Sequence, residues 1–261
     1  MISYNKKIIN KNFSNKAYDY ENHAIVQKYA ASELLKKLNL IIDLKNFNHK
    51  KIIDLGSGTS LIRKEFCKVS QGQDNLFYEL DLSLKMLKSS QNNSPNLFKI
   101  QSDIENLPLQ QNNFDLILSS FVFHWLDDYQ KIFSDIFSLI KPQGILAFCL
   151  PVSGSCAQLK ELNFININNF PNIIHLNNCL ENVGFKAISI NHQKYSQPFE
   201  NAIEAIHSFK KIGANYAFNN IDASPKNFTN LKNFYKKNLH NSGKKFSLDW
   251  QIYFYFLKKN V

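Results

Sequence analysis

Short apolar runs separated by longer mixed segments dominate the middle of the chain. Five of them lie between residues 51 and 150 and predict buried strands: KIIDL, LFYEL, NLFKI, FDLILSS and GILAFCL. Between the last two, apolar residues at positions 129, 132, 133, 136, 137 and 140 follow the spacing of one helix face. Strands that alternate with helices predict a parallel sheet covered by helices, because parallel neighbours need crossover connections.

The flanking segments carry weaker patterns. Before the strands, residues 24–38 place apolar side chains on one helical face. After them, we expect a helix that ends at Gly184, a strand over 186–195, and a final strand that includes WQIYFYFL from Trp250. Residues 199–245, between these last two strands, are interpreted as an inserted lid that begins with a short helix.

Composition places the chain among ordinary folded proteins. Of its 261 residues, 44% are hydrophobic and 20% are charged, so a buried core should form. The four cysteines show no regular spacing with each other or with histidine, which predicts scattered thiols and no metal site. No apolar run approaches the roughly 20 residues that span a bilayer, and the first residues lack the apolar stretch of a secretory signal. We therefore expect a cytoplasmic protein without a membrane partner.

The net charge of +10 suggests an acidic partner, but the kind of basic residue matters. Arg63 is the only arginine, and the other basic residues are lysines. Specific contacts to nucleic acid usually use the arginine fork, so we expect no nucleic-acid partner. Most of the net positive charge comes from residues 190 onward, where Lys210, Lys211, Lys236 and Lys237 are candidates for contacting an acidic protein.

The first strand runs directly into a glycine turn, LGSGTS, which predicts a ligand site. Gly56 and Gly58, with Ser57 between them, allow the backbone to approach a ligand closely. Asp54 at the end of the strand is expected to hold the turn or to face the ligand. The next strand ends at Asp81, and the carboxyl ends of neighbouring parallel strands meet at one crevice. A carboxylate there suits the ribose diol of a nucleoside ligand.

The glycine pattern favours one nucleoside ligand over another. The third glycine of the dinucleotide fingerprint is absent, which disfavours NAD and its pyrophosphate. S-adenosylmethionine has a nucleoside but no phosphate, so a ribose acid and a bare backbone suffice. Leu82 follows the ribose acid, and Asp103 and Ile104 follow the third strand, where they can contact the adenine amino group and ring. The loop after the fourth strand brings Ser119 and His124 to the same crevice, at the expected methyl-transfer position.

Taken in order, these motifs resemble the class I S-adenosylmethionine-dependent methyltransferases: IIDLGSGTS, YELDLSLKML, SDIENLPL, NNFDLILSSFVFHW and LIKPQGILAF. Two flanking segments, FSNKAYDYENHAIVQKYAASELL and AIEAIHSFKKIGAN, are similar to the malonyl-acyl carrier protein O-methyltransferase family of biotin synthesis. The resemblance implies methyl transfer from S-adenosylmethionine to the free carboxylate of a malonyl thioester on acyl carrier protein. Tyr20 stands where this family has a tyrosine.

The resemblance also implies an α/β fold. We expect one domain, residues 1–261, with a Rossmann-like, mostly parallel seven-stranded sheet and helices on both faces. An N-terminal helical cap would cover residues 1–45, and the cofactor-binding core residues 50–150. Residues 151–261 would form the substrate side and the final strands, with the helical insertion at 199–245. We expect a monomer.

Transfer of a methyl group to a carboxylate predicts a site without a strong base. The nucleophile is already ionised near neutral pH, so the rate should come from alignment and from the exclusion of water. Tyr20 and His124 are the candidate catalytic residues on this interpretation.

Three alternatives remain open at this stage. The chain could methylate another small carboxylate or a quinone precursor, could act on RNA, or could be an assembly factor that keeps the fold without catalysis. RNA is disfavoured, because SSFV stands where amino-methylating enzymes of nucleic acids usually carry an Asn/Asp-Pro-Pro-aromatic run.

Overall fold

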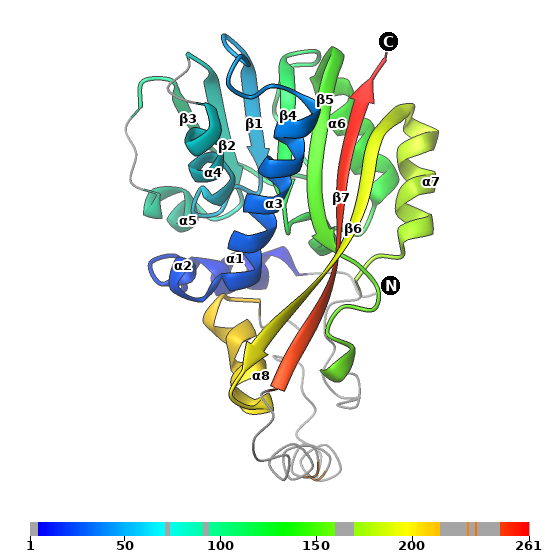
Figure 1. The fold of residues 1–261 in the computed structure, drawn as a ribbon. Helices are drawn as coiled ribbons and strands as arrows, with labels where there is room; N and C mark the ends of the chain where they lie inside the picture. Colours follow the sequence, from blue (N-terminus) through cyan, green and yellow to red (C-terminus); the bar gives the residue numbers. More distant parts are fainter. Residues whose placement is uncertain are drawn as a thin grey trace.

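The computed structural model describes residues 5–70, 74–90, 94–159, 170–214, 229, 233 and 246–260. These residues form a seven-stranded sheet of order β3-β2-β1-β4-β5-β7-β6 (Figure 1). The first five strands run parallel, and β7 runs antiparallel to both of its neighbours. The strands are β1 (Lys51–Leu55), β2 (Leu76–Asp81), β3 (Leu97–Gln101), β4 (Phe114–Ser120), β5 (Ile140–Pro151), β6 (Phe185–Phe199) and β7 (Phe246–Lys259). The expected mostly parallel, Rossmann-like sheet is confirmed.

Helices cover both faces of this sheet. They are α1 (Lys6–Ser14), α2 (Tyr20–His23), α3 (Ile25–Ile41), α4 (Leu61–Ser70), α5 (Leu84–Ser89), α6 (Tyr129–Leu139), α7 (Ile173–Val183) and α8 (Ala202–Lys211), with the 3-10 turns η1 (Phe123–Trp125) and η2 (Ala157–Leu159). Figure 1 shows α3 in front of the sheet and α6 behind it. The expected N-terminal helical segment is present.

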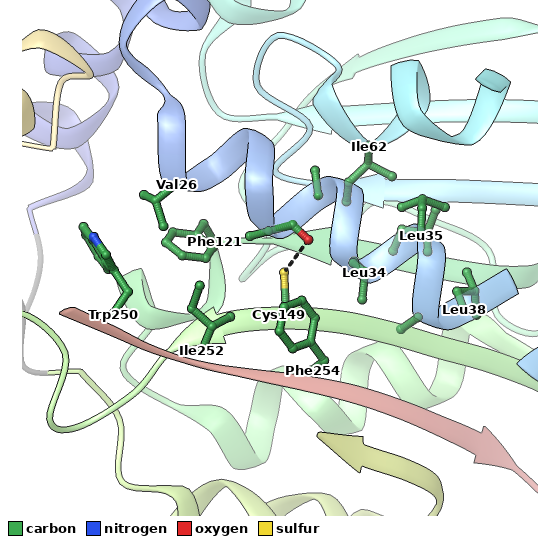
Figure 2. Close-up of a cluster of buried hydrophobic side chains, with 14 of the residues drawn as sticks. Val26, Leu34, Leu35, Leu38, Ile62, Phe121, Cys149, Trp250, Ile252 and Phe254 are labelled. Carbon is green, nitrogen blue, oxygen red and sulfur yellow. Dashed lines mark hydrogen bonds between the residues drawn. The ribbon is translucent and has the colours of Figure 1, made fainter. Parts of the chain in front are cut away.

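Alternation along the strands produces two hydrophobic layers. In β1, Ile52 belongs to the layer under α3 and α4, whereas Ile53 belongs to the layer under α6 and α7. Figure 2 shows the first layer, where Leu34 and Leu38 of α3 lie over side chains of β7, including Phe254. Four of the five predicted runs therefore reflect strands with buried side chains. The prediction is wrong for NLFKI, because β3 lies at the edge of the sheet, has no buried residue and leaves Phe98 exposed.

The last two strands form a long ribbon that extends beyond the parallel strands (Figure 1). The expected strand over 186–195 continues to Phe199, and the final strand begins at Phe246, before Trp250. Both are longer than the apolar pattern alone indicates, because they pair with each other along their whole length. The predicted end of α7 at Gly184 is confirmed, since this residue has a left-handed φ of +102°.

The ribbon carries α8 to the region below α1 and α2 in Figure 1. This helix is the main described part of the expected insertion, residues 199–245; most of the remainder, including Lys236 and Lys237, lies outside the described residues. An added Cβ on Gly213, just after α8, would lie 2.8 Å from the Asn12 carbonyl oxygen of α1. The chain after α8 thus packs closely against the N-terminal helix.

In the described part of the chain, no helix combines the length and the apolar character needed to cross a membrane.

Candidate functional site

The glycine turn after β1 is built by hydrogen bonds to the end of β2. The backbone N–H groups of Gly56 and Ser57 donate to the Leu80 carbonyl oxygen at 2.7 and 3.0 Å. Gly56 has a φ of +72°, and an added Cβ would lie 2.3 Å from Val122 Cγ2, so only glycine fits there. Gly58 has a φ of +53°, but a Cβ on it would meet nothing within 4 Å. Its bare backbone therefore faces open space, as a close ligand requires.

Asp81 at the end of β2 joins this turn to the start of α5. Its Oδ2 accepts a hydrogen bond from Gly58 N–H at 2.9 Å, and its Oδ1 accepts one from Ser83 N–H at 2.7 Å. Ser83 in turn caps α5 by accepting from Met86 N–H, as its position in the sequence indicates. Burial raises the pKa of Asp81 to about 6, and the two backbone hydrogen bonds oppose this rise.

A cavity of about 140 Å³ lies over the carboxyl ends of the parallel strands. It brings together six of the predicted cofactor residues, which are Gly56, Gly58, Asp81, Leu82, Asp103 and Ile104. Tyr20, Ser120 and Phe121 also line it. The crevice expected from the order of the strands is therefore open, and Asp81 is one of its walls.

Helix α1 covers this cavity, which the sequence pattern does not reveal. Lys6 Nζ forms ion pairs with Asp103, at 2.6 Å, and with Glu105. Phe13 packs edge-on against Trp125 with ring centroids 5.7 Å apart. The face of α1 that would otherwise be exposed thus contacts the loops that carry the predicted adenine residues. No residue of α1 is buried, so its amphipathic pattern is easily taken for a surface helix.

A second cavity, of about 40 Å³, lies under the glycine turn and contains Asp54 and Ser57. Both carboxylate oxygens of Asp54 are buried without a hydrogen-bond partner among the described residues. Burial, together with the charges of Glu79 and Asp81, raises the pKa of Asp54 well above its usual range, and Arg63 opposes this. Arg63, the only arginine of the chain, bonds Glu79 at 2.7 Å in the interior.

A third cavity, also about 40 Å³, is walled mainly by aromatic side chains. It is lined by Phe13, Tyr20, Gln27, Phe121, His124, Trp125, Phe170, Phe209, Ile212, Ala214 and Trp250. Tyr20 lines all three cavities, so its side chain stands at their junction. Phe121 adopts a left-handed φ of +58° at the end of β4, a conformation that bulky side chains rarely take.

The two candidate catalytic residues are both uncharged at neutral pH. Burial lowers the pKa of His124 to about 3, so its imidazole is uncharged at neutral pH. Burial is also the main cause that raises the pKa of Tyr20, with the nearby charges of Asp81 and Glu21 adding to it. The junction between the cavities is thus lined by neutral polar groups.

One predicted residue, Ser119, lies apart from the three cavities. The Ser119 hydroxyl donates to the Leu55 carbonyl oxygen at 2.8 Å, between two strands, and lines none of the three cavities.

Two buried polar residues of the aromatic cavity, Gln27 and Trp250, are absent from the sequence prediction. Gln27 lies within an apolar helix pattern and Trp250 within an aromatic strand, and both patterns are typical of core. The only sequence signal for a binding role of these two residues is a polar atom within a pattern that is otherwise apolar.

Comparison with known sequences gives a family match in the same region. The model of the family described as "Methyltransferase domain" matches residues 53–148. The malonyl-[acyl-carrier protein] O-methyltransferase 2 of Coxiella burnetii is 31% identical over 218 residues, which cover 82% of this chain and 84% of the relative. The malonyl-[acyl-carrier protein] O-methyltransferase 1 of Ilyobacter polytropus is 29% identical, covering 89% of this chain and 85% of the relative.

Solved structures show the same fold at lower identity. A phosphoethanolamine N-methyltransferase 2 of Haemonchus contortus, in complex with S-adenosyl-L-methionine, has a TM-score of 0.53 and 18% identity, covering 86% of this chain and 53% of its own. An S-adenosylmethionine-dependent methyltransferase from Mesorhizobium loti has a TM-score of 0.51 and 14% identity, covering 81% of this chain and 91% of its own. At such identities the likeness establishes the fold alone.

Proposed function

The chain belongs to the malonyl-[acyl-carrier protein] O-methyltransferase family, and from this membership we infer its reaction. It transfers a methyl group from S-adenosylmethionine to the free carboxylate of a malonyl thioester carried on acyl carrier protein. The methyl ester removes the negative charge of the malonyl group, and this is an early step of biotin synthesis.

The residues of the cavity over the carboxyl ends of the parallel strands fit the proposed cofactor. Asp81 is a half-buried carboxylate at the end of β2 and can accept hydrogen bonds from both ribose hydroxyls. The open space beside Gly58 admits the ligand close to the backbone, and Asp103 and Ile104 lie where the adenine would be held. Asp54 and Ser57 line the adjoining small cavity under the turn. When bound, S-adenosylmethionine supplies an electrophilic methyl group on a sulfonium centre.

The observation that carries the proposal is the junction at Tyr20. The cofactor cavity and the aromatic cavity share Phe13, Tyr20, Phe121 and Trp125 as walls, so a ligand in one lies next to a ligand in the other. No described residue that lines the aromatic cavity is acidic or basic at neutral pH. A carboxylate acceptor needs no base, because it is already ionised, and it gains from a site that excludes water.

Tyr20 and His124 act on the acceptor as neutral groups in this proposal. The Tyr20 hydroxyl keeps its proton at neutral pH and can donate to the acceptor carboxylate while closing the space between the cavities. His124 is uncharged and positions the acceptor rather than removing a proton. Lys210 and Lys211, exposed at the end of α8, are proposed to contact the carrier protein.

The test is methyl transfer itself. Malonyl-acyl carrier protein is incubated with the protein and S-adenosylmethionine and then measured by intact mass spectrometry. We expect one added methyl group on the malonyl moiety, and transfer about 10- to 100-fold slower with the Asp81→Ala variant, which loses a charge-assisted acceptor worth about 1.5–3 kcal/mol. Binding of S-adenosylmethionine without transfer to malonyl-acyl carrier protein would contradict the proposal. That outcome would favour a different acceptor or a non-catalytic assembly factor.

A further inference from the structure

Three buried polar side chains line the aromatic cavity, and each has one buried polar atom without a hydrogen-bond partner among the residues that the structure describes. We propose that Trp250, Gln27 and His124 hold the carboxylate of the acceptor through neutral N–H groups, in place of a basic side chain. The proposal rests on the proposed function, because it assigns the binding site of that carboxylate within the same cavity system.

Burial and missing partners mark these three residues. Trp250, Gln27 and His124 are 5%, 8% and 6% exposed. Trp250 Nε1, Gln27 Oε1 and His124 Nδ1 are buried, and none has a hydrogen-bond partner among the residues that the structure describes. Buried polar groups are nearly always paired in folded proteins. Three exceptions on the walls of one cavity indicate that the partner is a ligand.

The three side chains converge from distant parts of the chain. Gln27 comes from the first turn of α3, His124 from η1 after β4, and Trp250 from β7. The Phe121 ring lies 5.9 Å from both the His124 ring and the Trp250 ring. Phe170 lies 5.8 Å from the His124 ring and 6.1 Å from the Trp250 ring. Figure 2 shows Trp250 and Phe121 at the same end of the buried cluster, next to Val26.

The donor chemistry suits an anion. An indole N–H can only donate, and a neutral imidazole donates from Nδ1 in one of its two tautomers. The Gln27 amide presents either its oxygen or its NH₂ group after rotation, so it can also donate. Gln27 lines both the aromatic cavity and the small cavity beside the glycine turn. Among the three donors it therefore lies nearest to the cofactor side of the junction.

Neutral donors also explain how the site can bind a carboxylate and still leave it reactive toward the methyl group. The negative charge of the nucleophile disperses as the new bond to the methyl group forms. A lysine or arginine in direct contact would stabilise the charged ground state more than this transition state. The described walls of the aromatic cavity include neither residue type. Neutral N–H groups orient the carboxylate with a smaller loss of reactivity, and the aromatic rings exclude water.

The test removes the indole donor and keeps an aromatic ring, in the Trp250→Phe variant. We expect kcat/KM for malonyl-acyl carrier protein to fall about 10- to 100-fold, the range for a hydrogen bond to a charged group, while the affinity for S-adenosylmethionine stays within about twofold. Tyr253→Phe is the matched control, because it removes a hydroxyl from the same strand outside the three cavities. It should leave both quantities unchanged.

A binding measurement separates recognition of the carboxylate from a general loss of the pocket. With S-adenosylhomocysteine present, calorimetry compares malonyl-pantetheine with its methyl ester. Trp250→Phe should weaken binding of the free carboxylate about tenfold or more and should change binding of the ester less than about threefold. A general packing defect would weaken both ligands equally and would overturn the proposal. Gln27→Met, which keeps the length of the side chain without its amide, should give the same selective loss.

The two proposals fail in different ways. If the wild-type protein methylates malonyl-acyl carrier protein and Trp250→Phe retains its activity and carboxylate affinity, the neutral-donor site is wrong and the function stands. If the wild-type protein binds S-adenosylmethionine but neither methylates nor binds malonyl thioesters, the proposed function is wrong and the donor site falls with it.

Discussion

Asp81 combines a structural task with a binding task, and its pKa links them. Its two carboxylate oxygens hold the Gly58 turn and the start of α5, while the same group faces the cofactor cavity. Burial is the main reason why its pKa rises to about 6. Below that pH the free protein carries a protonated Asp81, whereas hydrogen bonds from two ribose hydroxyls favour the carboxylate.

We therefore expect the affinity for S-adenosylmethionine to fall as the pH drops through 6, by about tenfold for each further pH unit. Calorimetry at pH 5, 6 and 7.5 measures this. An Asp81→Asn variant should bind weakly at each pH, with no comparable slope, because the amide does not titrate. A wild-type affinity that stays constant down to pH 5 would show that ionised Asp81 is not needed.

Single residues also show where the sequence was informative and where it was not. Gly56, Gly58 and Asp81 could be identified because turn chemistry and strand order are local signals, and the structure places all three at one cavity. Trp250 could not, because its place depends on the pairing of β7 with β5 and β6, which joins residues far apart in the chain. Arg63 stands out in the sequence only as the sole arginine, and nothing near it in the chain indicates its buried partner Glu79.

At the scale of elements, α1 is the part of the cofactor site that is easiest to perturb. Its ion pairs from Lys6 to Asp103 and Glu105 are partly exposed, and such pairs contribute about 0–1 kcal/mol. Lys6→Met should loosen α1 over the cavity and speed the dissociation of S-adenosylmethionine about two- to fivefold. Stopped-flow displacement measures this rate.

The matched control for α1 is Lys7→Met. Lys7 is exposed on the same helix and makes no ion pair with any described residue, so its removal changes the net charge equally. If both variants release the cofactor at the same rate, the effect is one of overall charge and α1 is not held by Lys6. The local pattern predicts α6 and α3 well because these helices pack a full face on the sheet, whereas α1 packs on loops and on the start of α5.

At the scale of the whole molecule, the parallel sheet followed from the alternation of strands and helices, since few topologies satisfy that pattern. The antiparallel β6–β7 ribbon carries α8 to the cavity side of the sheet, where Ile212 and Ala214 line the aromatic cavity. Lys210 and Lys211 are exposed just before these two wall residues. Positive charge therefore lies next to two wall residues of the aromatic cavity.

If the carrier protein docks on α8 as proposed, we expect the reaction with it to be sensitive to salt. The chain has a net charge of +10, and the range of electrostatic attraction shrinks from about 10 Å at 0.1 M salt to about 3 Å at 1 M. If the carrier protein presents acidic helices to α8, kcat/KM for malonyl-acyl carrier protein should fall about tenfold between about 0.1 M and 0.5 M NaCl, because steering affects the association rate.

Malonyl-pantetheine provides the comparison, since it carries the same reacting carboxylate without the protein. Its kcat/KM should change less than about twofold over the same range, because a buried site of neutral donors is screened little by salt. Steady-state kinetics with both substrates measures the two slopes. Equal slopes would place the salt effect at the carboxylate itself and would contradict both the neutral cavity and the proposed docking of the carrier protein on α8.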